Sequence, residues 1–558
     1  MKKIKLFTPI ISLALLFGVL SLNNNTQKIV AVIEGESAQL FNENETIDLD
    51  LYKRHAILQI NKVNLSLYRT AEASEVTTLI NETTVKINSC QSINEVDSVV
   101  SSFDRYLLTI KTDAQLTQEE EERRQEEEAE KYHISSYEEL LAFRDDVNSG
   151  YSYQDETIVL TNDIVVPAGK PFSPIGPSEA KAFAGTFDGN NHKISGLTLS
   201  GATVGFIYFG TKCTIKNLIF ENVNITATTQ RAAGVISRAD AVTLDNIHIT
   251  SGTITGPTQS GGLIGALVGK NGDSIIKNCS NNATVQTTET AGAASGGVAY
   301  VFSGGLSMSN FENTGLISTS TKSAGGFIGH IASSGTTVNV YNCNNTGSIT
   351  GSGLGVSGGV GFSAGTSLTI ESCANSGTVI NSGEATGGLF GYSASVTKAT
   401  SIIVRDSVNT GSISGQSNGT GGVVGAHNAS ATYMTFIVDG CTNRGSVNGL
   451  NYVGGVVGLI RNSTADSYIN NCFNYGNVTA SSTATTVGCG GVVGTARVNL
   501  TNSGCYYNVT LSAKSNTKAA ADLSELGTPG FIALNYETNC KTHTNNRLID
   551  ANGNDYVA

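Results

Sequence analysis

The second half of the chain repeats one pattern of apolar, small and polar positions. The stretch YVGGVVGLIRNSTADSYINNCFNYGNV (452–478) contains a glycine-rich apolar segment, an apolar segment that ends at Cys472, and a short segment that ends at Val478. Alignment on this cysteine gives seven anchor positions: Cys279, Phe311, Cys343, Cys373, Ser407, Cys441 and Cys472. Between the anchors stand GGxxG segments, such as GGFIG at 325 and GGVVG at 421, which recur every 29 to 36 residues. Agreement at a fixed period is the signature of a repeat architecture.

Four further positions agree from unit to unit. The residue three before the anchor is always apolar: Ile276, Met308, Val340, Ile370, Val404, Val438 and Ile469. The residue two after it is always Asn: Asn281, Asn313, Asn345, Asn375, Asn409, Asn443 and Asn474. The residue four after it is Gly in six units: Gly315, Gly347, Gly377, Gly411, Gly445 and Gly476. The residue six after it is Val or Ile: Val285, Ile317, Ile349, Val379, Ile413, Val447 and Val478.

These registers predict a right-handed parallel β-helix over 157–515, with three short strands in each coil. Such a strand cannot bury itself, but equivalent strands stacked about 4.8 Å apart can. The side chain two before the anchor is often charged, so a corner must follow it to turn the anchor inward. We expect the Asn two residues later to lie in that bend with left-handed backbone angles and to form hydrogen bonds from coil to coil. We expect the next Gly to supply a positive φ.

The residues before the repeats show helical periodicity. The best example carries Ile93, Val96, Val99, Val100, Phe103, Leu107 and Ile110 on one stripe, and Ser92 with Glu95 forms a capping-box pattern at its start. Three such segments predict a three-helix module at 47–116. It is similar to helical spacer modules in surface proteins of Gram-positive-type bacteria. The run QEEEERRQEEEAEK predicts a charged helical linker at 117–133, and a short helix capped by Ser136 predicts a cap of the repeat domain at 134–156.

The two ends of the chain differ from the rest. Lys2, Lys3 and Lys5 precede an apolar run that ends at Leu22, which predicts a signal peptide or an uncleaved N-terminal anchor at 1–27. A linker at 28–46 follows, and residues 516–558 are expected to form a C-terminal cap or tail. We therefore expect a secreted or cell-surface protein, with membrane contact only through an uncleaved N-terminal segment.

Composition narrows the classes of partner. Among 558 residues, 14% are charged, 63 are Gly and 39% are hydrophobic, which suits short strands and tight turns better than disorder. The net charge of −12 argues against nucleic acid and anionic membrane surfaces as partners, because both repel further negative charge.

The motifs also resemble a known family. FAGTFDGNNHKISGL (183–197), followed by the GGVVG and NCxNxG units, resembles the GLUG-motif proteins of bacterial surfaces. EELLAFRDDVNSG and ETIVLTNDI resemble the beginning of that domain, so the resemblance covers about 135–510. It implies a parallel β-helix but no particular chemistry. Family members occur beside varied partner domains, including those of IgA-cleaving peptidases, and no peptidase domain is visible in this sequence.

An enzyme must also be considered, because β-helices include polysaccharide lyases and glycoside hydrolases. A hydrolase of this shape needs two carboxylates that flank the bond. Here the carboxylates of the repeats come singly, and Glu371 and Asp439 share a register two units apart. The pair Asp145 and Asp146 is expected to face solvent, and Asp188 belongs to the turn signature of the family. We therefore predict no catalytic residues and no enzyme activity.

Metal and thiol chemistry gave weaker signals. His330 and His427 follow glycine segments without a carboxylate at fixed spacing, and we interpret them as surface or corner residues. DANGND (550–555) begins like a calcium loop but lacks the required Gly and Glu. No zinc spacing is present, so we predict no metal and no cofactor. Ten cysteines in an exported protein could form disulfides, but Phe311 and Ser407 share their register, which favours reduced thiols stacked in the core.

The sequence as a whole predicts an exported, non-catalytic β-helix protein with an adhesin-like binding role or a role in structural display. Its expected partner is an extracellular glycan or a host or matrix protein, and we expect no nucleic-acid partner. The alternative is a polysaccharide lyase or glycoside hydrolase of the β-helix type. A purely mechanical spacer is a third possibility.

Overall fold

The computed structural model divides into two compact units, Met1–Glu127 and Glu128–Ala558. It describes residues 48–508 except 130–131, 171, 290–291, 321, 333–335, 395–399, 429–433, 462–466, 482–487, 497–499 and 504. It also describes the strands at 30–34, 37–41, 514–515, 540–544 and 547–549. The predicted signal or anchor at 1–27, the DANGND motif and most of the predicted C-terminal tail lie outside these residues.

The described residues of the first unit form an antiparallel pair of strands, β1 (Val30–Glu34) and β2 (Ser37–Phe41), and four helices with one short 3-10 turn. The helices are α2 (Leu49–Ile60), α3 (Thr70–Ser89), α4 (Ile93–Leu107) and α5 (Asp113–Ala129), and the turn is η1 (Leu65–Leu67). Ser92 accepts a hydrogen bond from the Glu95 amide, which confirms the predicted cap of α4. The predicted stripe is also confirmed, since Val96, Val100 and Phe103 are buried in the core that α2, α3 and α4 share.

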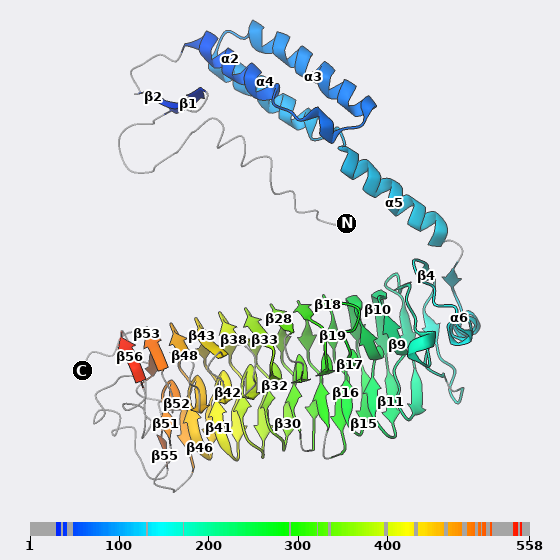
Figure 1. The fold of residues 1–558 in the computed structure, drawn as a ribbon, viewed down its shortest axis with the longest axis vertical. Helices are drawn as coiled ribbons and strands as arrows, with labels where there is room; N and C mark the ends of the chain where they lie inside the picture. The colour runs from blue at the N-terminus through cyan, green and yellow to red at the C-terminus, as the bar shows by residue number, and fades with distance from the viewer. Residues whose placement is uncertain are drawn as a thin grey trace. The chain divides into compact units, whose positions relative to one another are not determined.

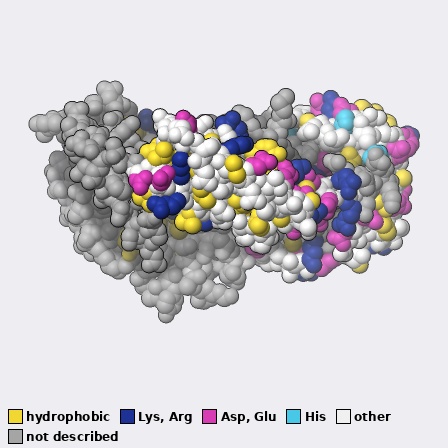
Figure 2. Space-filling model, turned by 90° about the horizontal axis from the view of Figure 1, so that it is seen from above, with side chains coloured by type: hydrophobic (Ala, Val, Ile, Leu, Met, Phe, Trp, Pro, Cys, Tyr) yellow, Lys and Arg dark blue, Asp and Glu magenta, His cyan; other side chains and the backbone are white. Residues whose placement is uncertain are grey.

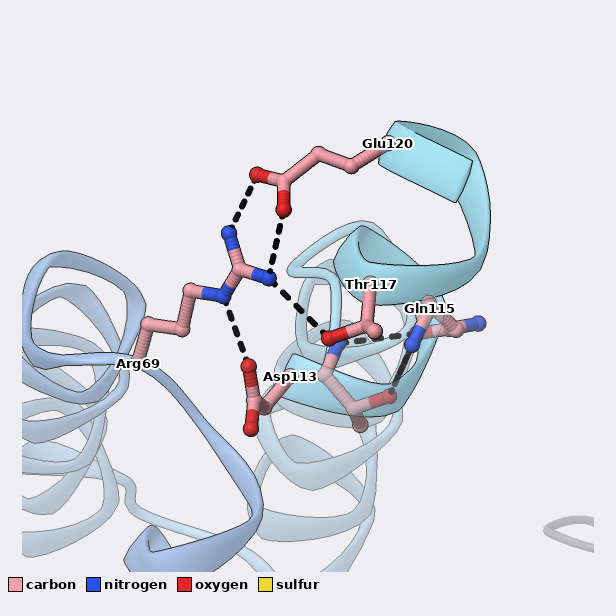
Figure 3. Close-up of polar contacts among 6 residues, drawn as sticks. Arg69, Asp113, Gln115, Thr117 and Glu120 are labelled. Atoms are coloured by element: carbon pink, nitrogen blue, oxygen red, sulfur yellow. Dashed lines mark hydrogen bonds and ion pairs between the residues drawn. The ribbon is translucent and has the colours of Figure 1, made fainter. Parts of the chain in front are cut away.

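Arg69 ties the charged helix α5 to the rest of the helical unit (Figure 3). Its Nε lies 2.6 Å from Asp113 Oδ1, and its Nη2 donates to Glu120 Oε2 at 3.0 Å and to Thr117 Oγ1 at 3.0 Å. These two carboxylates raise the pKa of the guanidinium, with the Glu120 hydrogen bond as the largest cause. The charged helix therefore begins at Asp113, four residues before the predicted linker, and its first turns contact the bundle.

The second unit is a parallel β-solenoid of about ten turns in which equivalent strands stack in chain order (Figure 1). Most coils contain five short strands where the sequence predicted three, and the coils that begin at Thr214 and Thr243 contain four because one long strand replaces the first two. Two differences explain the count. The GGxxG segment is split by a bend after its first Gly, and the Asn two residues after the anchor lies in a separate strand of two residues.

Each turn of the solenoid crosses four sheets, I to IV. Sheet I receives a first strand from each turn: β3 (His133–Ile134), β4 (Thr157–Leu160), β6 (Thr186–Asp188), β10 (Thr214–Glu221), β14 (Thr243–Ile249), β18 (Ser274–Lys277), β23 (Leu306–Ser309), β28 (Thr337–Tyr341), β33 (Ser367–Glu371), β38 (Thr400–Arg405), β43 (Met434–Asp439), β48 (Ser467–Asn470), β53 (Leu500–Ser503) and β56 (Cys540–Thr544). It receives a second strand after the corner: β5 (Ile164–Val165), β7 (Lys193–Ser195), β19 (Ser280–Asn281), β24 (Glu312–Asn313), β29 (Asn344–Asn345), β34 (Ala374–Asn375), β39 (Val408–Asn409), β44 (Thr442–Asn443), β49 (Phe473–Asn474), β54 (Tyr506–Asn508) and β57 (Arg547–Ile549).

The remaining strands form three sheets of one strand per coil. Sheet II contains β8 (Thr198–Gly201), β11 (Val223–Ala227), β15 (Gly252–Gly256), β20 (Thr284–Thr287), β25 (Ile317–Ser318), β30 (Ile349–Gly351), β35 (Val379–Asn381), β40 (Ile413–Gly415), β45 (Val447–Gly449), β50 (Val478–Ala480) and β55 (Lys514–Ser515). Sheet III contains β12 (Arg231–Ala233), β16 (Gln259–Gly261), β21 (Ala293–Ser295), β26 (Ala324–Gly325), β31 (Val356–Ser357), β36 (Thr386–Gly387), β41 (Asn418–Gly421), β46 (Asn451–Gly454) and β51 (Cys489–Gly490). Sheet IV contains β9 (Ile207–Thr211), β13 (Ile236–Asp240), β17 (Ile264–Leu267), β22 (Val298–Val301), β27 (Ile328–Ile331), β32 (Val360–Ala364), β37 (Phe390–Ala394), β42 (Val424–Asn428), β47 (Val457–Arg461) and β52 (Val493–Ala496).

The helix α6 (Tyr137–Ser149) covers the N-terminal end of the solenoid core. Ser136 accepts from the Glu139 amide, as predicted, and Gly150 ends the helix with φ 121°. The buried face of α6 joins the central core, where the Phe143 ring packs on Tyr153 at 5.0 Å and on Phe183 at 5.7 Å. A short 3-10 turn, η2 (Glu179–Lys181), lies in the loop before β6.

The corner of sheet I lies where the sequence placed it, but its left-handed residue was predicted wrongly. The residue just before the anchor has φ between 49° and 63°: Asn278, Asn310, Asn342, Ser372, Asp406, Gly440 and Asn471. Asn two residues after the anchor does not have a positive φ and is fully buried. Asn tolerates the left-handed region, and the exposed residue before the anchor is the one that needs it.

The buried Asn residues form the predicted ladder. Each Nδ2 donates to the Oδ1 of the next Asn at 2.7–2.9 Å and to the carbonyl two residues later in its own coil at 2.9–3.0 Å. Asn345 and Asn375, for example, are direct partners on neighbouring strands. The ladder ends where Ile249 pairs with Asn281 and Tyr507 pairs with Asn474. The amide side chains thus satisfy buried backbone carbonyls that no strand partner reaches.

The Gly four residues after the anchor has a different role from the predicted one. None of the six has a positive φ. A Cβ on any of them would lie 1.9–2.1 Å from the carbonyl oxygen of the equivalent residue in the preceding coil. These glycines are therefore required because successive coils approach too closely for a side chain, not because of backbone angle.

Candidate binding surfaces

The residue that follows each GGxxG segment forms one row along sheet IV, which we call the aromatic row. Its members are in register from coil to coil: Phe209, Arg238, Ala266, Tyr300, His330, Phe362, Tyr392, Ala426, Leu459 and Thr495. They pack in small clusters that are separate from the central core. The row therefore runs along the outer side of sheet IV, against residues of sheet III and the turns that precede it.

Four rings in the middle of this row stack on each other. The His330 ring lies 4.5 Å from Tyr300 and 4.2 Å from Phe362, and Phe362 lies 5.6 Å from Tyr392. Next to them Phe302, which is 40% exposed, stacks on Tyr300 at 4.2 Å. This row was not predicted, because the alignment of the repeats rests on the glycines and does not include the residue after them. Tyr300, Phe362 and Tyr392 at that position were the available signal.

The interpretation of His330 and His427 as surface or corner residues was wrong. His330 is 6% exposed and His427 is fully buried. His330 Nδ1 lies 2.8 Å from Ser323 Oγ, and His427 Nδ1 lies 2.5 Å from Ser393 Oγ. Burial lowers the pKa of His427 to about 3, and burial with the nearby Lys322 charge lowers the pKa of His330 to about 3. Both rings are therefore neutral members of the packed structure.

Three cations border the first half of the aromatic row. The Arg238 guanidinium carbon lies 5.0 Å from the Phe209 ring centroid, and that of Arg231 lies 5.6 Å from Phe302. Lys322 Nζ lies 4.9 Å from the Tyr300 ring. Burial, then repulsion by Arg238, lowers the pKa of Arg231. Within the described part of the chain, the Nε of Arg231 and the Nε of Arg238 are buried and have no hydrogen-bond partner.

The outer face of sheet II is uncharged over ten strands, and we call it the hydroxyl face. Its side chains flank the inward Val, Ile or Leu of each strand in two rows, and all are exposed or half-buried. One row is Thr198, Asn224, Thr253, Thr284, Leu316, Ser348, Thr378, Ser412, Ser446 and Asn477. The other is Ser200, Thr226, Thr255, Gln286, Ser318, Thr350, Ile380, Ser414, Asn448 and Thr479. The strands are in register from β8 to β50, so both rows run along the solenoid.

Charged side chains on sheet I alternate in sign along a third row. Its members, in register, are Asp188, Lys216, Asp245, Lys277, Ser309, Tyr341, Glu371, Arg405, Asp439 and Asn470. Lys216 lies 3.1 Å from Asp188, Lys277 lies 3.1 Å from Asp245, and Arg405 lies 2.7 Å from Glu371. Glu371 and Asp439 are thus two coils apart, as predicted, with Arg405 between them. Figure 2 shows, on another face of the molecule, Lys and Arg side chains near Asp and Glu side chains.

The other sequence candidates have structural partners. Asp188 Oδ1 accepts hydrogen bonds from the Asn190 amide and Asn217 Nδ2, as a turn residue would. Asp145 and Asp146 are both exposed. Seven cysteines are buried free thiols: Cys90, Cys213, Cys279, Cys343, Cys373, Cys441 and Cys472. Cys489 and Cys505 are also buried. Burial raises the pKa of Cys213 and Cys279 to about 12, so these thiols are unreactive at neutral pH.

The described residues contain no group of three or more His, Cys, Asp and Glu side chains placed to hold a metal ion. Among the helices described, none combines the length and apolar character of a membrane span.

The architecture defines the class of protein, a parallel β-solenoid preceded by a helical region. No protein-family model matches the chain, so the resemblance to GLUG-motif proteins stays an interpretation of the motifs. The chain is similar to halomucin of Haloquadratum walsbyi, with 35% identity over 131 residues, which are 22% of this chain and 1% of halomucin. It thus spans a very small part of that relative. It is also similar to the crystal structure of a "putative immunoglobulin A1 protease" from Bacteroides ovatus, with a TM-score of 0.37 and 20% identity over 44% of this chain and 77% of the other.

Proposed function

We propose that this chain is an exported, non-catalytic solenoid that binds an extended neutral glycan outside the cell through the hydroxyl face. The observation that carries the proposal is the pair of uncharged rows along sheet II. Successive members of a row are about 4.8 Å apart, and the two rows are about 7 Å apart along each strand. A neutral polysaccharide presents hydroxyl groups along its whole length, so it can form many weak hydrogen bonds with such an array.

The charge distribution supports this partner. The chain has a net charge of −12, yet none of the twenty side chains of the hydroxyl face is ionisable. A charged polymer or a charged protein surface would find no opposite charge there, whereas a neutral polymer desolvates no charge and can replace the water on the hydroxyl groups with its own hydrogen bonds. Export is supported by the basic and apolar N-terminal residues, which remain the basis of the proposed extracellular location.

The alternating row of sheet I gives no support to hydrolysis. A glycosidase needs two carboxylates at a distance that spans the sugar bond. In the alternating row each carboxylate instead has a cation as a neighbour, as Glu371 has Arg405. The rival function, a polysaccharide-degrading enzyme, therefore receives no specific support from this row.

The test is a pull-down of the full chain with cellulose, chitin and xylan, together with a glycan array. Thr350 lies near the middle of the hydroxyl face, in register with Ser318 and Ile380. We expect Thr350→Lys to reduce binding at least about tenfold, because it places a charge within an uncharged contact. Thr435→Lys is the matched control, since Thr435 is an exposed threonine on sheet I.

Two results would overturn the proposal. The first is equal binding by Thr350→Lys and the wild type, or binding to matrix proteins without glycan. The second is steady release of reducing ends or unsaturated products from any of these polymers, which would make the protein an enzyme.

A further inference from the structure

A groove runs along the helical unit between α3 and α4. It has a volume of about 450 Å³, and side chains of both helices line it. Its floor is apolar, since Phe103 is buried and Leu79 and Val99 are half-buried. Tyr106 stands at one end of the groove and is 50% exposed. A concave site of this volume with an apolar floor and a polar rim has the form of a site for a small ligand.

Two carboxylates of α3 lie in this groove on either side of Leu79. Glu75 comes one turn before Leu79, and Glu82 comes about one turn after it, so the three side chains share one face of the helix. The two glutamates are two turns apart, which is about 10 Å along the helix axis. Glu75 Oε1 accepts a hydrogen bond from the Tyr106 hydroxyl at 3.2 Å. Among the described residues, Glu75, Glu82 and the neighbouring Lys86 belong to no ion pair.

A buried hydroxyl group in the groove has no partner. Thr83 lines the groove and is 3% exposed. On the same helix, the hydroxyls of Thr77 and Thr78 donate to the carbonyl four residues earlier, at 2.7 Å and 3.0 Å. The Thr83 hydroxyl forms no such bond, nor any other hydrogen bond within the described part of the chain. A ligand that brings an N–H donor to this position would therefore satisfy a polar group that the protein leaves unpaired.

We propose that this groove binds a linear aliphatic diamine or polyamine. One ammonium group lies against Glu75 and beside the Tyr106 ring, which attracts cations. The second lies against Glu82 and donates to the Thr83 hydroxyl. The methylene chain between them packs on Leu79. The order of carboxylate, apolar side chain and carboxylate along α3 thus matches the order of ammonium, methylene chain and ammonium in the ligand.

Other ligand chemistries fit the groove less well. An anionic ligand is repelled by both carboxylates, and a neutral apolar ligand leaves both of them without a partner. The site belongs to the helical unit and shares no residue with the hydroxyl face of the solenoid. It therefore goes beyond the proposed binding of a neutral glycan and does not depend on it.

The experiment is isothermal titration calorimetry of the full chain at low salt with four small molecules. Octanediamine carries two ammonium groups on a chain that can span two helical turns, and putrescine carries the same groups on a chain of half that length. Octylamine carries one ammonium group, and octanediol carries none. We expect octanediamine to bind about fivefold more tightly than octylamine or putrescine, since a second ionic contact on an exposed rim is worth up to roughly that factor. Octanediol should not bind, and the affinity for octanediamine should fall at high salt.

Variants locate the site. Glu75→Gln and Glu82→Gln should each weaken the binding of octanediamine about fivefold. Thr83→Val keeps the shape of the side chain and removes the hydroxyl, so it should weaken binding about tenfold. It should not lower the melting temperature of the ligand-free protein, because the hydroxyl has no partner to lose. The matched control is Glu121→Gln, which removes the same charge from an exposed position on α5 and should leave the affinity unchanged.

Several results would overturn the proposal. Absence of octanediamine binding is the first, and equal affinity for octanediamine and octylamine is the second, since it would show that only one carboxylate is used. Binding of octanediol would show that the charges are not recognised. An equal loss in Glu121→Gln and Glu82→Gln would show diffuse attraction to an acidic chain, and unchanged affinity in Thr83→Val would contradict the placement of the second ammonium group. Thr350→Lys changes the other unit and should leave diamine binding intact, so failure of the neutral-glycan proposal and failure of this one can be told apart.

Discussion

The sharpest test of the coil structure is the replacement of Asn443 by Leu in the middle of the Asn ladder. Asn443 is fully buried, and its Nδ2 donates to Gly445 O at 2.9 Å and to Asn474 Oδ1 at 2.8 Å. Its Oδ1 accepts from Asn409 Nδ2 at 2.8 Å. Leu keeps the approximate volume of the side chain and removes all three hydrogen bonds.

The expected cost follows from which groups keep another partner. The Gly445 carbonyl loses the side-chain donor that satisfies it, at about 1–3 kcal/mol for a buried group. Asn409 Nδ2 keeps Gly411 O, and Asn474 Oδ1 keeps the Gly476 amide, so these two losses cost about 1 kcal/mol each. A total of about 3–5 kcal/mol follows. Gly422 adds to it, because its position packs directly on the flat Asn443 amide.

The assay is urea unfolding combined with hydrogen exchange across the coils from 405 to 480. The control is Asn448→Leu, the same change at an exposed position of the same coil, which should stay within about 0.5 kcal/mol. Because a solenoid is stabilised by contacts between neighbours, protection should also fall in the coils of Asn409 and Asn474. If Asn443→Leu is no less stable than Asn448→Leu, the ladder does not hold the coils together.

Two further predictions concern burial and close approach. His330 is neutral in the folded protein, where its pKa is lowered to about 3 from about 6.5 in the unfolded chain. Its contribution to folding stability is therefore complete above about pH 6.5 and is lost as the pH falls toward 3. At about pH 4.5 this loss of stability is about 2–3 kcal/mol. His330→Phe continues the ring stack and should therefore lose less stability than the wild type between pH 7 and pH 4.5 in thermal melts. An identical loss of stability in both proteins would contradict a buried, neutral His330. Gly445→Ala places a Cβ 1.9 Å from Gly411 O and should lower the urea midpoint far more than Ser446→Ala does, whereas equal midpoints would show that the coils can move apart.

The sequence predicted the inward residues, the Asn ladder and the caps of α4 and α6, because each depends on one residue type at a fixed spacing. It did not predict which residue of the corner is left-handed. Asn occurs both just before the anchor and two residues after it, and only the coordinates show that the first is exposed with positive φ. The predicted role of Gly445 was wrong for a similar reason. Positive φ and close approach both require glycine, and the distance between coils decides between them.

The binding surfaces were harder to predict than the core. Tyr300, His330 and Phe362 follow the glycine segments at one register, but the sequence does not say that the chain bends there and turns this position outward. The predicted β-helix includes the coil of Cys505, but the anchor alignment ended at Cys472 because Tyr507 stands where the ladder has Asn.

The alternating row of sheet I constrains how such a protein can change length during evolution. Duplication or deletion of whole coils preserves every strand pairing, so repeat number can vary without a new fold. Between Asp188 and Lys277, however, removal of a single coil would stack like charges, as when loss of the Lys216 coil brings Asp188 against Asp245. Removal of two coils would restore opposite neighbours. Around the uncharged Ser309 and Tyr341, a single coil can be gained or lost without stacking like charges. Insertions and deletions of single coils are therefore expected to accumulate in the middle of the array.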